Sequence, residues 1–83
     1  MYLIYGGDGC SACETAKRLA ESKNEPYEYM LMADLEMEEV NRLVAIAGKG
    51  FRSIPQIFFE DEEGFTTYVG GASDLREVLN AAE

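Results

Sequence analysis

The sequence predicts an α/β fold with four strands and three helices in the order βαβαββα. Short apolar runs alternate with segments in which apolar residues recur at helical spacing, and glycine or proline separates them. The first three elements form a strand-helix-strand unit of about 30 residues, which indicates a parallel pair with a right-handed crossover. The length of 83 residues allows one domain, expected to span residues 1–83.

The first half of the chain is expected to contain two strands and one helix. Residues 2–5 are a short buried strand, and the next four residues, 6–9, are turn formers. Helical spacing of small and apolar residues then extends over 11–23. After a break, residues 27–31 alternate as in a second strand.

The second half is expected to contain a helix, a hairpin and a final helix. In order, these are a helix over 35–47 ended by Gly48 and Gly50, a strand over 54–59, an acidic turn over 60–64, a strand over 65–69, and a helix defined by Leu75, Val78, Leu79 and Ala82. The residues expected to bring these two helices into the core are Val40, Leu43, Leu75 and Val78.

Charge and composition exclude several classes of function. Sixteen acidic and seven basic residues give a net charge of −9, so no basic footprint for nucleic acid or an anionic membrane is visible. The chain has no histidine, which excludes Ser-His and Cys-His nucleophile pairs and His-ligated metal sites. There is no long apolar run and no signal-peptide pattern, so we expect a cytoplasmic protein.

The two cysteines form the motif Cys10-Ser11-Ala12-Cys13 between a glycine-rich loop and a helix. A disulfide closing so short a loop stabilises a fold by only about 2 kcal/mol, so reversible thiol chemistry is the favoured interpretation. At a helix start, unpaired N–H groups would lower the pKa of Cys10 and make it the nucleophile, with Cys13 as the more buried resolving thiol. The alternatives are purely structural cysteines or half of a zinc site, which lacks a second ligand pair.

Three segments together resemble the glutaredoxin family. They are Tyr5-Gly6-Gly7-Asp8-Gly9-Cys10-Ser11-Ala12-Cys13 with Ala16-Lys17, Ser53-Ile54-Pro55-Gln56-Ile57-Phe58, and Val69-Gly70-Gly71-Ala72-Ser73-Asp74-Leu75. The resemblance covers nearly the whole chain, and the short length is similar to that of bacterial and phage-encoded members. It implies a thioredoxin-like fold, in which a four-stranded mixed sheet is flanked by three helices.

The resemblance also implies a glutathione-dependent thiol–disulfide oxidoreductase that needs no metal. The catalytic residues would be Cys10 and Cys13, and the bond between Ile54 and Pro55 would be cis. The expected glutathione contacts are Ser11, Ile54, Pro55, Ala72, Ser73 and Asp74. For Ser73 and Asp74, N-capping of the last helix is the structural alternative. The implied partners are glutathione and disulfide-bearing proteins, with ribonucleotide reductase as a candidate, and the protein is expected to be a monomer.

Three departures from the family pattern bear on function. Between the cysteines, Ser11-Ala12 replaces the family's usual Pro-aromatic pair. Three residues before the first cysteine, where a basic residue is common, this chain has Gly7, and the acidic Asp8 follows it. Family members without the motif proline sometimes carry a 2Fe-2S cluster between two subunits. A cluster-carrying dimer is therefore the first alternative function, and a redox-inert interaction module is the second.

Overall fold

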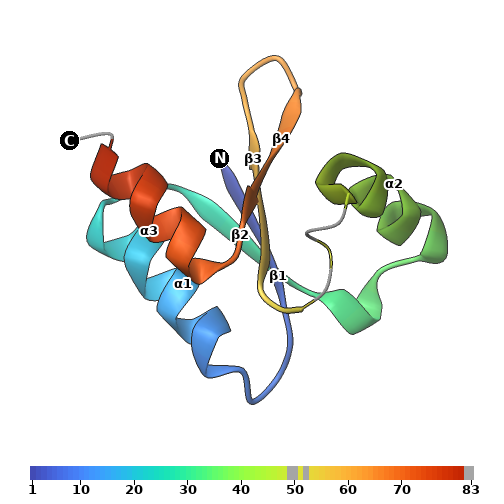
Figure 1. Ribbon diagram of the computed structural model, residues 1–83, viewed down its shortest axis with the longest axis horizontal. Helices are drawn as coiled ribbons and strands as arrows, with labels where there is room; N and C mark the ends of the chain where they lie inside the picture. Colours follow the sequence, from blue (N-terminus) through green and yellow to red (C-terminus); the bar gives the residue numbers. More distant parts are fainter. Residues whose placement is uncertain (49–50, 52, 82–83) are drawn as a thin grey trace.

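A computed structural model describes residues 1–48, 51 and 53–81 (Figure 1). Its elements are β1 (Tyr2–Gly6), α1 (Ser11–Ser22), β2 (Tyr27–Leu31), the 3₁₀ turn η1 (Met32–Asp34), α2 (Met37–Ala47), β3 (Gln56–Glu60), β4 (Thr66–Gly70) and α3 (Ala72–Ala81). The predicted order βαβαββα is confirmed. No described helix is long and apolar enough to cross a membrane.

The four strands form one mixed sheet in the order β2-β1-β3-β4. β1 runs parallel to β2 and antiparallel to β3, and β3 pairs with β4 as an antiparallel hairpin. The expected parallel crossover and hairpin are therefore both present. Figure 1 shows α1 and α3 together on one side of the sheet and α2 on the other.

Alternation along β1 divides the core into two layers. Ile4 packs with Ile57 and with residues of α1 and α3, whereas Leu3 and Tyr5 pack with Leu43 of α2 on the opposite face. Successive side chains of a strand point to opposite faces, so one five-residue strand supplies both layers. The whole of β1 is buried, and this fixes the position of the loop that follows it.

Three elements begin later than the sequence predicts. α2 begins at Met37 rather than at residue 35, because residues 32–34 form a 3₁₀ turn closed by the Leu35 N–H to the Met32 carbonyl at 3.2 Å. β3 begins at Gln56 rather than at residue 54, because Pro55 has no N–H to donate to a strand partner. β4 begins one residue later than expected, and Phe65 is exposed. Gly50 and Ala82, expected at helix ends, lie outside the described residues.

One predicted core residue is wrong. Leu43 and Leu75 are fully buried and Val40 is half-buried, but 42% of Val78 is exposed. Val78 and Val69 of β4 line the same open cavity. Val78 therefore lies at the edge of the side of α3 that packs against the sheet. Helical spacing identifies the apolar side of a helix, but not how far the neighbouring element extends over it.

Burial of Tyr5 predicts a loss of stability at alkaline pH. Burial raises the pKa of Tyr5 above 10.0, with Glu39 adding to the effect. The unfolded chain therefore releases this proton first, and stability falls as the pH rises above about 10. Tyr5→Phe should reduce this loss while keeping the edge-to-face contact with Phe58. Chemical denaturation from pH 7 to 11 measures it, and equal alkaline slopes for the two proteins would contradict the prediction.

Candidate functional site

The loop after β1 presents Cys10 at the start of α1. Gly9 adopts a φ of +67°, a left-handed conformation that glycine accepts without strain, and Cys10 follows with extended backbone as the N-cap residue. The Cys13 N–H donates to the Cys10 Sγ over 3.1 Å. The sulfur therefore occupies the place that an oxygen of serine or aspartate takes in an ordinary N-cap.

Cys10 and Cys13 form a disulfide, with their Cα atoms 5.2 Å apart. Cys13 is only 1% exposed and packs on the inner side of α1, whereas Cys10 is half-buried. When the disulfide is reduced, the Cys10 sulfur remains at the positive end of the helix dipole. The pair is therefore arranged for reversible thiol–disulfide chemistry, with Cys10 as the sulfur nearer to solvent.

Ile54 and Pro55 lie next to the loop that precedes Cys10. The peptide bond between them is cis, as the resemblance implied. Pro55 is buried, and 38% of Ile54 is exposed. A Cβ built on Gly7 would be 2.9 Å from the Ile54 Cδ1, so the Ile54 side chain covers the space that a side chain at position 7 would need.

The start of α3 borders the same region. A Cβ on Gly71 would lie 4.0 Å from the Pro55 carbonyl oxygen. The Asp74 carboxylate accepts the Gly71 N–H at 2.9 Å, and the Leu75 N–H donates to the Gly71 carbonyl. Asp74 thus caps α3 in the manner of the acidic member of a capping box. A carboxylate has further acceptor positions, so capping leaves Asp74 able to bind a second donor.

The other expected contact residues are accessible. Ser11 is the exposed first residue of α1, Ala72 is half-buried and Ser73 is exposed. The fold thus places the start of α1, the residues around Pro55 and the start of α3 around one region, although they are far apart in the sequence.

Tyr29 positions the loop, and no sequence pattern had indicated this role. Its hydroxyl donates to the Gly7 carbonyl at 3.2 Å, and it stands so close to Gly6 that a Cβ there would collide with it. The same Cβ would lie 2.8 Å from the Cys13 Sγ. Only the register of β2 against β1, which pairs Tyr29 with Ile4, brings this residue to the loop.

Lys17 supports Tyr29 from α1. Its Nζ lies 4.3 Å from the centre of the Tyr29 ring and 2.9 Å from the Glu14 carboxylate. The hydrogen bond to Glu14 raises the pKa of Lys17. The lysine is therefore already engaged by Glu14 and by the Tyr29 ring.

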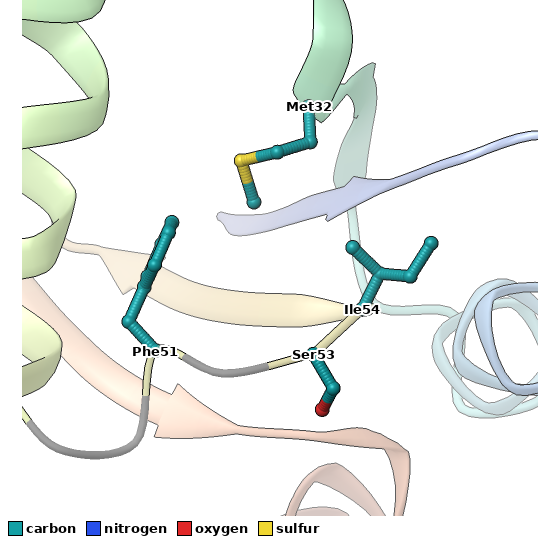
Figure 2. A pocket seen from close by; sticks show the side chains of 4 residues that line it. All are labelled: Met32, Phe51, Ser53 and Ile54. Carbon is teal, nitrogen blue, oxygen red and sulfur yellow. The ribbon is translucent and has the colours of Figure 1, made fainter.

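An open cavity of about 350 Å³ adjoins Ile54 and was not anticipated (Figure 2). The side chains of Met32, Phe51 and Ile54 converge on it, whereas the Ser53 hydroxyl points away. Met32 belongs to the 3₁₀ turn that the sequence pattern had not revealed. The described residues contain no cluster of three or more histidine, cysteine or acidic side chains that could hold a metal.

Comparisons with known proteins agree with this geometry. The family model described as Glutaredoxin matches residues 2–63. Glutaredoxin 1 of Rickettsia prowazekii is 34% identical over 88% of this chain and 70% of its own. Glutaredoxin of enterobacteria phage T4 is 30% identical over 93% of this chain and 97% of its own.

Two solved structures share the fold. Reduced Escherichia coli glutaredoxin superposes with a TM-score of 0.72 at 26% identity, covering 96% of this chain and 93% of its own. A buckwheat glutaredoxin–glutathione complex gives a TM-score of 0.70 at 15% identity, covering 98% of this chain and 69% of its own. The thioredoxin-like arrangement expected from the sequence is therefore confirmed.

The surroundings of Cys10 predict a pKa that is lowered by the helix terminus and not by a neighbouring base. Gly7→Lys should lower the Cys10 pKa further by adding a positive charge, relative to Gly7→Ala, which displaces Ile54 equally without charge. Asp8→Asn should act in the same direction, because it removes a negative charge two residues away. Thiolate ultraviolet absorbance against pH measures the effect. Equal values for all these proteins would show that the flanking charges do not influence Cys10.

Proposed function

The chain belongs to the glutaredoxin family, whose members are thiol–disulfide oxidoreductases, and on that premise we propose that it reduces protein disulfides and glutathione mixed disulfides using glutathione. The observation that carries the proposal is the Cys10–Cys13 disulfide at the start of α1. It is the oxidised product that such a reaction leaves on the protein.

The first half of the reaction oxidises the protein. The Cys10 thiolate attacks one sulfur of a substrate disulfide, forms a mixed disulfide and releases the other substrate sulfur as a thiolate. The Cys13 thiol, one helical turn away, loses its proton, attacks the Cys10 sulfur and releases the second substrate thiolate. Two electrons pass to the substrate, and the Cys10–Cys13 disulfide remains.

The second half uses two molecules of glutathione. The first glutathione thiolate attacks the Cys10 sulfur and releases Cys13, which takes up a proton. The second attacks the glutathione sulfur of that mixed disulfide, releases the Cys10 thiolate and leaves as glutathione disulfide. For a substrate that already carries glutathione, Cys10 alone completes the cycle, because the protein-glutathione intermediate forms directly.

Glutathione would bind across the region formed by α1, Pro55 and α3. Ser11 is at the start of α1, and the Ile54 backbone lies outside the sheet, where it is available to pair with the peptide. The side chain of Pro55 would form the floor. The free N–H groups at Ala72 and Ser73 suit the γ-glutamyl carboxylate, and Asp74 suits the ammonium group. The location of all three segments around Cys10 supports this assignment.

The remaining properties follow the family resemblance. We propose that the chain is a single domain over residues 1–83 and acts in the cytoplasm as a monomer. Its protein substrates would be disulfide-bearing proteins, ribonucleotide reductase among the candidates.

Replacing each cysteine tests the reaction. Cys10→Ser should reduce all exchange to the uncatalysed rate, because it removes the accessible nucleophile. Cys13→Ser should retain deglutathionylation and lose reduction of protein disulfides, because it removes only the resolving thiol. A coupled assay with glutathione, glutathione reductase and NADPH measures both activities. Activity in Cys10→Ser that is lost in Cys13→Ser would reverse the two roles.

The same samples distinguish the alternative functions. Visible charge-transfer absorption in anaerobically purified protein would favour the cluster-carrying dimer. A protein that shows neither absorption nor turnover would favour the redox-inert module.

Asp74 is predicted to serve both capping and glutathione binding. Asp74→Ala should lower stability by about 1 kcal/mol, because it leaves the Gly71 N–H without its acceptor. Asp74→Asn keeps an acceptor and should cost less. Both variants remove the charge that would face the glutathione ammonium, so both should raise the KM for glutathione by a similar factor. Denaturation measures the capping role and steady-state kinetics measures the binding role. An unchanged KM for glutathione in Asp74→Asn would show that Asp74 only caps α3.

A further inference from the structure

Arg18 and Arg76 differ from Lys17 and Arg42, two cations that each form an ion pair among the described residues. Lys17 pairs with Glu14 and Arg42 with Glu39. Within the described residues, neither Arg18 nor Arg76 has a carboxylate within 4 Å. The chain has sixteen acidic residues and seven basic ones, yet none of the described carboxylates pairs with these two arginines.

Both arginines line one groove between α1 and α3, which lie side by side in Figure 1. The groove has a volume of about 300 Å³, and its lining residues are Thr15, Arg18, Leu19, Ser22 and Arg76. The two helices are packed together, because the fully buried Ala16 of α1 lies in one core cluster with Leu75 and Leu79 of α3. The two guanidinium groups thus come from two helices held in a fixed relation.

The acidic residues near Arg18 on α1 have other partners. Glu14 accepts from Lys17, and Glu21 accepts from the Tyr27 hydroxyl. The closest partners of these two carboxylates are therefore Lys17 and Tyr27 rather than Arg18. A guanidinium presents a planar set of donors that matches a carboxylate or a phosphate, so the groove is suited to an oxyanion.

The hydroxyl groups of the groove decide which oxyanion fits. Thr15 donates to the Ser11 carbonyl at 3.1 Å, and Ser22 donates to the Leu19 carbonyl at 2.8 Å. Their oxygens are thus left only as hydrogen-bond acceptors. They would repel the oxygens of a free phosphate, but they can accept hydrogen bonds from backbone N–H groups. A polypeptide that carries an acidic side chain offers both the carboxylate for the arginines and the N–H groups for the hydroxyls.

We propose that the groove formed by Thr15, Arg18, Leu19, Ser22 and Arg76 binds an acidic segment of the protein substrate. This inference rests on the proposed reduction of protein disulfides. Thr15 and Arg18 follow Cys10 by about 8 and 12 Å along the helix, which an extended peptide spans in about three or four residues. The preferred substrate therefore carries Asp or Glu about that far from its reactive cysteine.

Disulfide peptides of matched sequence test the groove. One peptide carries two glutamates about four residues from the reactive cysteine, and the other carries glutamines there. The reduced protein should react with the acidic peptide about fivefold faster than with the neutral one, as charge-assisted contacts at an exposed site allow. Arg18→Gln and Arg76→Gln should each lower the rate for the acidic peptide only. The ratio of the rate with the acidic peptide to that with the neutral peptide should fall towards one in about 0.5 M salt.

Arg42→Gln is the matched control, because it makes the same charge change on α2, on the other side of the sheet. Equal losses of rate with the acidic peptide in Arg42→Gln and Arg76→Gln would show that only net charge matters, and would overturn the proposed binding in the groove. Equal rates for the two peptides would overturn it as well. Competition by inorganic phosphate at constant ionic strength would assign the groove to a free oxyanion and also overturn it. Failure to reduce either peptide would instead refute the proposed function itself.

Discussion

The hydrogen bond from the Cys13 N–H to the Cys10 sulfur is the interaction around which the site is built. It makes Cys10 the N-cap residue of α1. The same sulfur atom therefore accepts one of the unpaired N–H groups at the start of the helix and is the reactive group of the site. The cap requires Cys10 to be extended, and Cys13 then falls one turn later on the buried side of α1. Helix geometry alone thus gives the two sulfurs unequal access to solvent.

The remainder of the fold holds this cap in place from several directions. β1 is buried along its whole length and leads directly into the loop. Tyr29 of β2 binds the loop at Gly7 and is itself covered by Lys17 of α1. Ile54 contacts the loop from the side of β3. The loop is therefore held by its continuation from β1, by Tyr29 of β2 and by Ile54 in the turn before β3.

Much of this arrangement could be predicted from the sequence, because strong local signals specify it. The continuous apolar run of β1 and the small residues of α1 determine those elements, and the cysteine spacing determines the redox pair. The 3₁₀ turn at Met32 and the exposure of Val78 could not be predicted, since each depends on how far a neighbouring element extends. Tyr29 and the cavity at Met32 and Phe51 depend on strand register and tertiary packing. Arg18 and Arg76 meet only because two helices from opposite ends of the chain pack together.

The unequal burial of the two cysteines also bears on oxidative damage. A peroxide reaches Cys10 more readily than Cys13 and would convert the outer sulfur to a sulfenic acid. Cys13 already lies at bonding range behind it and can condense with that sulfenic acid, releasing water and closing the disulfide. The irreversible sulfinic and sulfonic acids lie beyond that step, so the buried partner keeps an oxidised protein within the reach of thiol reductants. The arrangement that suits electron transfer thus also protects the reactive sulfur from permanent loss.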